Sequence, residues 1–141
     1  MLDKIIPKKI IHIFDLIRLD KPIGFMLLLW PCWFALAHIQ QNKFEQIAWY
    51  AYLFFGAFLM RSAGCIINDL VDIKLDRNVE RTANRPLTSN KVTFLEAIAL
   101  LIFLLFLSFL ILLKFDFKAI LLSLSSIPLI IFYPFMKRYT Y

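Results

Sequence analysis

Four polar side chains at the end of a long apolar run have the types and spacing of a metal-binding group. Asn68, Asp72 and Asp76 are four residues apart, so on a helix each lies only about 40° around the axis from the one before it. Asp69, three residues before Asp72, would lie beside this face. Carboxylates this close repel each other unless a cation lies among them, and such an oxygen-rich set suits Mg²⁺. The alternative is a solvated acidic helix end whose charge is balanced by nearby Arg and Lys side chains.

The segment that follows, residues 69–93, mixes these carboxylates with three arginines, Arg77, Arg81 and Arg85. Guanidinium groups pair with phosphate oxygens, so arginines beside a metal-binding carboxylate cluster suit a metal-bridged diphosphate. The other interpretation is a set of surface ion pairs worth less than about 1 kcal/mol each. A loop of this length is longer than packing requires, which favours a functional role.

The composition is typical of a membrane protein. Hydrophobic residues make up 61% of the 141 positions, 18% are charged, and the mean hydropathy is +0.73. The net charge of +6 does not indicate nucleic-acid binding, because the basic residues gather between apolar runs, where lipid headgroups are the nearer partner. We therefore predict an all-α integral membrane protein in a lipid bilayer.

Four apolar segments are long enough to cross a bilayer, and they predict a polytopic bundle of four transmembrane helices at about 23–40, 46–68, 94–113 and 117–135. Twelve basic residues lie in the stretches 1–22 and 69–93 and in the tail after the last segment, against three in the opposite loops. Positively charged loops stay in the cytoplasm. The N-terminus, the loop 69–93 and the tail are therefore predicted to be cytoplasmic.

The basic stretch at the N-terminus also contains apolar residues at helical spacing: Ile6, Ile10, Ile13, Phe14 and Ile17. This pattern predicts an amphipathic helix on the membrane surface. A simple positively charged flank is the alternative.

Basic and aromatic residues elsewhere could extend the acidic site. Arg61 lies within the second apolar segment, seven residues before Asn68, and so two turns deeper on nearly the same face. A cation there costs about 2.5–3.5 kcal/mol unless it faces a cavity or a partner. At the end of the fourth segment, Tyr133 and Lys137 are one turn apart and Arg138 follows. These three residues would form a second wall of the site, or else an interfacial anchor.

Two of these patterns resemble motifs of the UbiA superfamily of intramembrane prenyltransferases. Asn68-Asp69-x-x-Asp72-x-x-x-Asp76 is similar to the first aspartate-rich motif of that family, and Tyr133-x-x-x-Lys137 looks like its fourth-helix motif. Longer runs resemble the branch that prenylates 4-hydroxybenzoate in ubiquinone synthesis: residues 18–36, 60–87 and 133–140.

The resemblance implies a Mg²⁺-dependent membrane enzyme. It would transfer a polyprenyl chain from an allylic polyprenyl diphosphate to the ring carbon of 4-hydroxybenzoate ortho to the hydroxyl. The implied metal ligands are Asn68, Asp69, Asp72 and Asp76, and the implied catalytic residues are Asp72, Asp76 and Arg138. The implied substrate contacts are Arg61, Arg77, Arg81, Arg85, Tyr133 and Lys137. The implied location is the bacterial inner membrane, or the mitochondrial inner membrane in a eukaryote.

Other interpretations stay open from the sequence. A relative in the superfamily could use homogentisate, a naphthoate or haem as acceptor, and a transporter piece or a helical scaffold would carry no catalysis. Transport favours charges near mid-membrane in broken helices, whereas here they gather at one edge. The superfamily has about twice this many helices and a second aspartate-rich motif, while no acidic residue follows Asp116 here. The resemblance thus predicts that residues 1–141 are the N-terminal half of the prenyltransferase domain, inactive without a separate C-terminal half.

The orientation predicts when a cysteine at position 90 can be labelled. With Cys32 and Cys65 replaced by serine, Asn90→Cys should resist a membrane-impermeant thiol reagent in intact cells and react after lysis, because the loop 69–93 faces the cytoplasm. Lys114→Cys, in an opposite loop, is the matched control and should react in intact cells. Labelling of Asn90→Cys in intact cells would contradict the predicted topology.

Overall fold

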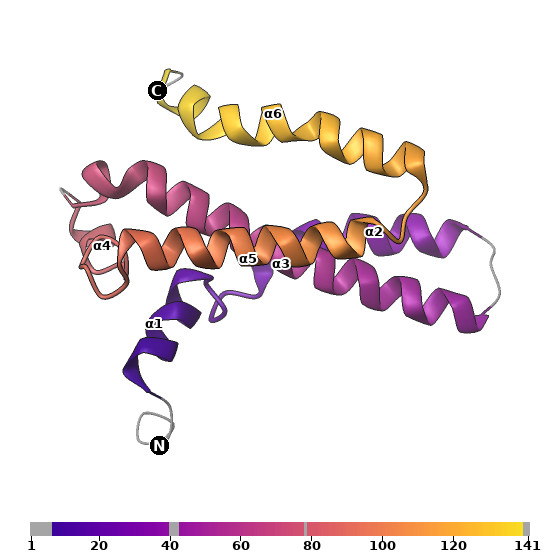
Figure 1. The fold of residues 1–141 in the computed structure, drawn as a ribbon, viewed down its shortest axis with the longest axis horizontal. Helices are drawn as coiled ribbons and strands as arrows, with labels where there is room; N and C mark the ends of the chain where they lie inside the picture. The colour runs from indigo at the N-terminus through magenta and orange to yellow at the C-terminus, as the bar shows by residue number, and fades with distance from the viewer. Residues whose placement is uncertain (1–6, 40–42, 78, 140–141) are drawn as a thin grey trace.

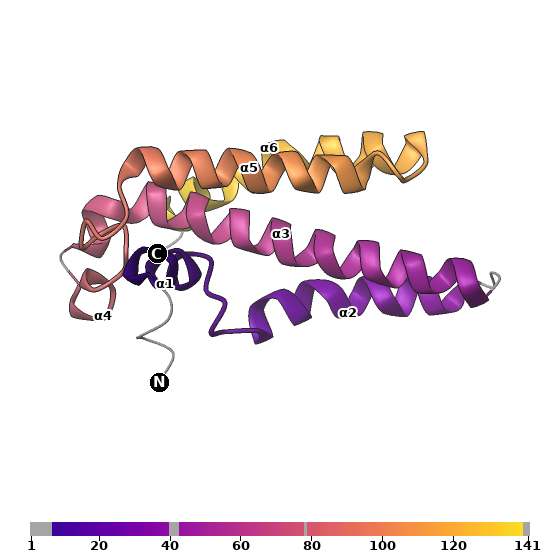
Figure 2. The same cartoon turned by 60° about the horizontal axis from the view of Figure 1, so that its bottom comes forward.

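The computed structural model describes residues 7–39, 43–77 and 79–139, and all regular structure in these ranges is α-helical. The helices are α1 (Lys8–Leu16), α2 (Ile23–His38), α3 (Lys43–Asp76), α4 (Glu80–Ala83), α5 (Phe94–Leu112) and α6 (Phe117–Tyr139). The long helix α3 is the centre of the arrangement, with α2 and α5 packed along it (Figure 1). Figure 2 shows α3 between α5 and α2, with α1 beside the end of α3 that leads into α4.

The all-α prediction is confirmed for the described residues, and each of the four predicted apolar segments coincides over most of its length with a helix: α2, α3, α5 and α6. Among the described residues, two helices are long and apolar enough to cross a membrane, Ile47–Ile73 within α3 and Phe94–Leu112. The apolar helices Ile23–His38 and Phe117–Ile130 are shorter. Two of the four predicted transmembrane helices thus meet this criterion, and the cytoplasmic orientation of the N-terminus stays a prediction.

The predicted cytoplasmic segment 69–93 begins as helix, in agreement with the helical spacing of Asn68, Asp72 and Asp76. The helix α3 continues without interruption to Asp76, and α4 forms within the remainder. No glycine or proline interrupts residues 69–76, and Leu70 and Ile73 in this stretch pack against the core. The acidic residues therefore lie on the rigid end of a long helix.

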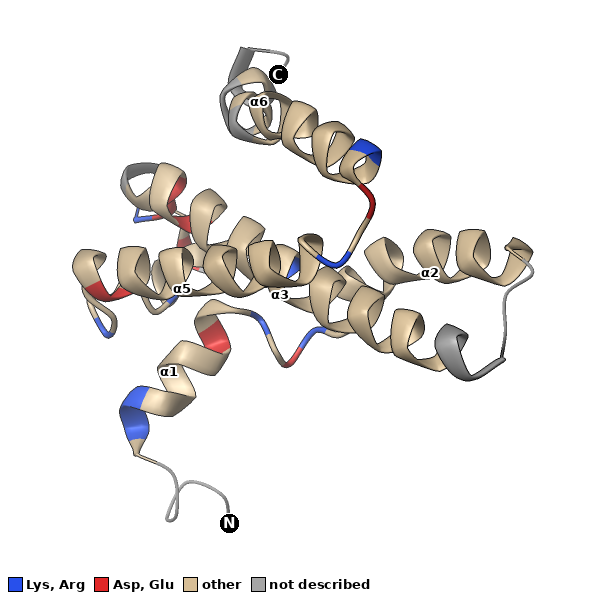
Figure 3. Cartoon of the chain, turned by 45° about the vertical axis from the view of Figure 1, so that its right-hand side comes forward, with Lys and Arg blue, Asp and Glu red and all other residues tan. Residues whose placement is uncertain are grey.

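The buried core lies near this end of the molecule, where helices and loop converge. Its apolar residues come from α1, α3, the loop before α5, and α5: Leu16, Ala63, Ile66, Leu87, Val92, Ala97 and Leu104. Many other large apolar side chains are exposed, among them Leu27, Leu95 and Leu129. Figure 3 shows long uncharged stretches on α2, α5 and α6. Apolar helix surfaces of this extent are typical of contact with lipid or with further protein.

The start of α5 is fixed by a capping box. The Thr93 hydroxyl accepts a hydrogen bond from the Glu96 backbone N–H at 3.3 Å, and the Glu96 carboxylate accepts one from the Thr93 backbone N–H at 3.1 Å. This reciprocal pair satisfies N–H groups that would otherwise lack partners at the helix start. Lys9 of α1 forms an ion pair with the same Glu96 carboxylate. The capped end of α5 is thus a contact point for α1.

The helix predicted within residues 1–22 is confirmed as α1, and one of its apolar side chains faces protein. Leu16 is fully buried in the core, whereas Phe14 is 40% exposed. We expect Leu16→Ala to destabilise the fold by about 2–5 kcal/mol, because the truncation leaves a cavity in packed surroundings. Phe14→Ala is the control and should lower the thermal unfolding midpoint in detergent much less. Equal effects of the two substitutions would mean that α1 is not packed on the bundle.

Candidate functional site

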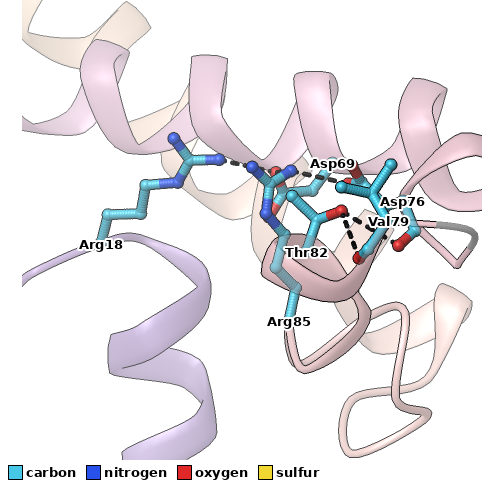
Figure 4. Close-up of polar contacts among 6 residues, drawn as sticks. All are labelled: Arg18, Asp69, Asp76, Val79, Thr82 and Arg85. Carbon is cyan, nitrogen blue, oxygen red and sulfur yellow. Dashed lines mark hydrogen bonds and ion pairs between the residues drawn. The ribbon is translucent and has the colours of Figure 1, made fainter.

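A buried carboxylate at the end of α3 binds two arginines. Asp69 is 3% exposed, and its Oδ1 accepts hydrogen bonds from Arg18 Nη2 at 2.9 Å and from Arg85 Nη1 at 3.1 Å (Figure 4). The same Arg85 nitrogen donates to Asp76 Oδ2 at 2.6 Å. Arg85 therefore bridges two carboxylates of the predicted metal-binding group.

Helix geometry explains why one arginine reaches both carboxylates. Asp69 and Asp76 are seven residues apart on α3, which is about two turns, so they lie on the same face. Arg85 approaches this face from the turn that follows α4. That turn is held in place by Thr82, whose hydroxyl donates to the Asp76 carbonyl oxygen at 3.0 Å.

Arg18 reaches the same carboxylate from the other side, from the connection between α1 and α2. Its backbone φ is 55°, in the left-handed region that few residues other than glycine adopt. Such a conformation costs of the order of 1–3 kcal/mol and persists when the surroundings hold it. Around this turn the Arg18 N–H donates to the Asp15 carbonyl oxygen, the Leu19 N–H donates to the Phe14 carbonyl oxygen, and the Arg18 side chain pairs with Asp69.

A pocket of about 280 Å³ lies beside this network, between α3 and α6. Its lining includes Arg18, Arg61, Asn68 and Tyr133. Arg61, Asn68 and Tyr133, which the sequence predicts to belong to one site, all line this pocket. Arg61 and Asn68 meet there because they are two turns apart on one face of α3.

The other predicted residues divide into three groups. Asp72 is half-buried one turn beyond Asn68, and Arg77 is exposed at the end of α3. Asp69, Asp76 and Arg85 are engaged with one another, as described above. The side chains of three residues lie outside the described part of the chain: Arg81, Lys137 and Arg138.

Arg18 is a pocket residue that sequence reasoning missed. From the sequence, Arg18 is only one of several basic residues in the stretch 1–22, which indicate that this stretch is cytoplasmic. Its partner Asp69 is 51 residues further along the chain, and no helical periodicity relates residues on separate elements. The sequence signal that could have drawn attention to it is its place at the start of the run 18–36, which had been singled out as a whole.

Asn68 lines the pocket and Asp72 follows it one turn further along α3, and their oxygen atoms are of the type that a hard divalent cation binds. In the described ranges, no three His, Cys, Asp or Glu side chains gather closely enough to form a complete metal site. Asn68 and Asp72 are one turn apart, and together they offer an amide oxygen and a carboxylate. Mg²⁺ commonly binds through one or two carboxylates and completes its shell with water and substrate phosphates.

Comparison with known proteins places this arrangement in a family. The sequence model of the UbiA prenyltransferase family matches residues 28–141. That region contains Arg61, Asn68, Asp72 and Tyr133, whereas Arg18 lies before it. No solved structure is significantly similar to the chain.

Curated relatives are similar over nearly all of the chain. It is 47% identical over 133 residues to the 4-hydroxybenzoate octaprenyltransferase of Histophilus somni (strain 2336), covering 94% of this chain and 46% of that protein. The protein of that name from Pseudoalteromonas translucida (strain TAC 125) is 43% identical over 139 residues, covering 99% and 47%. The one from Vibrio campbellii (strain ATCC BAA-1116) is 50% identical over 129 residues, covering 90% and 44%. The chain therefore spans about half the length of the curated relatives it matches.

The buried ion pairs of Asp69 generate a stability prediction. Asp69→Ala should destabilise the fold by about 3–5 kcal/mol, because it leaves Arg18 without its partner and Arg85 with only one. Asp20→Ala removes an exposed carboxylate from the same region and should change the thermal unfolding midpoint in detergent little. If the two substitutions lower the midpoint equally, the network does not hold the three segments together.

Proposed function

The chain belongs to the UbiA prenyltransferase family, and from that premise we propose that it takes part in prenylation of 4-hydroxybenzoate. The reaction transfers a polyprenyl chain from an allylic polyprenyl diphosphate to the ring carbon ortho to the hydroxyl. Three relatives that match at 43–50% identity are named 4-hydroxybenzoate octaprenyltransferase, which supports the proposal. Their bacterial sources and the apolar helices favour the bacterial inner membrane as the location.

The observation that carries the proposal is the pocket that joins Arg18, Arg61, Asn68 and Tyr133. The two guanidinium groups carry positive charge and N–H donors suited to the oxygens of a diphosphate, while the amide oxygen of Asn68 suits a bound metal ion. The exposed apolar surfaces of α2, α5 and α6 offer the polyprenyl chain a lipid-like path. The polar head of the donor would lie in the pocket while its tail stays among the helices or in lipid.

We propose that Asn68, Asp72 and Asp76 hold Mg²⁺ in this site. When bound, the ion supplies positive charge that stabilises the diphosphate as the allylic C–O bond breaks. Arg18 and Arg61 would pair with the remaining phosphate oxygens and keep the departing group in place. The proposed outer contacts are Arg77, Arg81, Arg85, Lys137 and Arg138.

Asp69 was predicted as a further metal ligand, and the structure suggests a different role for it. Its side chain is 3% exposed, and its Oδ1 accepts hydrogen bonds from both Arg18 and Arg85. We propose that its carboxylate positions these two guanidinium groups. Arg18 would then reach the diphosphate while it stays anchored to α3.

Exclusion of water is the other requirement, because water that reached the allylic cation would capture it in place of the aromatic ring. The chain spans about half the length of its relatives, and we propose that the remaining part of the enzyme closes the pocket and supplies a second metal-binding wall. That region would be a C-terminal half, and residues 1–141 alone would form no product.

Metal dependence tests the proposal. Residues 1–141 co-expressed with the non-aligned region of the Histophilus somni relative should prenylate 4-hydroxybenzoate, lose activity in EDTA and recover it with Mg²⁺. Asp72→Ala and Asp76→Ala should each lower the rate by about a hundredfold or more, because the metal-bound diphosphate loses a ligand. Product would be measured by chromatography of membrane extracts.

Controls distinguish loss of the metal site from misfolding or failed membrane insertion. Asp116→Ala removes an exposed carboxylate before α6 and should leave the rate unchanged, and both test variants should insert in membranes at normal levels. Near-normal rates for Asp72→Ala and Asp76→Ala would refute the proposed metal site. Product from residues 1–141 alone would refute the need for a second half. Transfer to homogentisate but not to 4-hydroxybenzoate would assign the chain to another acceptor.

A further inference from the structure

The Arg61 side chain of α3 packs against Gly24, in the first turn of α2. A Cβ atom at position 24 would lie 2.7 Å from Arg61 Nε, 2.8 Å from Nη2 and 3.1 Å from Cζ. All three distances are shorter than ordinary van der Waals contact. The guanidinium group therefore occupies the space that any other residue's side chain would need.

The backbone of Gly24 does not require a glycine. No described glycine has a positive φ, and the residue is helical. Alanine is the better helix former by up to about 1 kcal/mol in a helix interior. Among the described residues, the structure thus explains a glycine at position 24 only by the space that the Arg61 side chain occupies.

A methyl group at position 24 would move Arg61 rather than the helices. The neighbouring residue Phe25 makes edge-to-face contacts with Phe54 and Phe58 of α3, with ring centroids 5.5 Å and 5.8 Å apart. These contacts hold α2 against α3 at this level. Arg61 is exposed and its clashing atoms are at the far end of a flexible side chain, so displacement of its guanidinium group is the easier response.

Arg61 also lines the pocket that contains Asn68 and Arg18. Displacement of its guanidinium group would therefore change the pocket while the surrounding helices stay in place. We propose that Gly24 is a positioning residue, which seats the Arg61 guanidinium where it can bind the diphosphate of the donor. This inference rests on the proposed function, since it assigns Arg61 to the diphosphate.

The proposal predicts effects of opposite sign on stability and on binding. Gly24→Ala should leave the thermal unfolding midpoint unchanged or raise it, because alanine favours the helix. The same substitution should weaken binding of Mg²⁺-pyrophosphate by about tenfold to a hundredfold, the range for loss of a charge-assisted hydrogen bond. Binding would be measured by isothermal titration calorimetry on the co-expressed complex in detergent.

Gly56→Ala is the matched control. Gly56 is also a helical glycine, in α3, and a Cβ there would meet Ile111 at an ordinary 3.9 Å. This variant should gain helix stability without any change in pyrophosphate affinity. A double-mutant cycle completes the test: in an Arg61→Ala background, Gly24→Ala should have no further effect on affinity, because the group that it displaces is gone.

The outcomes separate the two proposals. If the unsubstituted complex does not bind Mg²⁺-pyrophosphate, the proposed function fails, and the role of Gly24 fails with it. If the complex binds but Gly24→Ala and Gly56→Ala bind equally well, the proposed function stands and the positioning role is refuted. A loss of affinity that persists without the Arg61 side chain would also refute it, because the methyl group would then act through something else.

Discussion

The burial of the Asp69 carboxylate constrains everything around the end of α3. A carboxylate that is 3% exposed is strongly destabilising unless it is paired, because burial removes the water that would solvate its charge. Its two partners come from opposite directions along the chain: Arg18 precedes α2, and Arg85 follows α4. The single carboxylate therefore holds two connecting segments against the same turns of one helix. The pocket lies beside that junction and shares Arg18 with it.

The pocket has one rigid wall and others that depend on packing. Arg61 and Asn68 both lie on α3, so their spacing is set by the geometry of one helix. Tyr133 comes from α6, which runs apart from the central helices in Figure 1, and Arg18 comes from an irregular connection. The Arg61 side chain lies where α2 contacts α3, in the space that is left because Gly24 has no side chain.

Periodicity explains which parts of this arrangement could be predicted from the sequence. The helices follow from long apolar runs, and the shared face of Arg61 and Asn68 follows from a spacing of seven on a helix. The helical spacing of Asn68, Asp72 and Asp76 agrees with α3, which continues past the apolar run to Asp76, where Leu70 and Ile73 pack against the core. The pairing of Asp69 with Arg18 could not be found in this way. It depends on a left-handed backbone at Arg18 and on tertiary packing, for which a single sequence has no local signal.

The distance along the chain between Arg18 and Asp69 has a consequence for the order of assembly. Contacts between residues 51 positions apart form only after the intervening chain has been ordered, because closing a long loop costs entropy that later contacts must offset. Here the intervening chain is the hairpin of α2 and α3. The N-terminal segment, although synthesised first, is therefore expected to dock after that hairpin has formed. Docking of this segment brings Arg18 to the pocket, so the pocket would be completed only after the hairpin has formed.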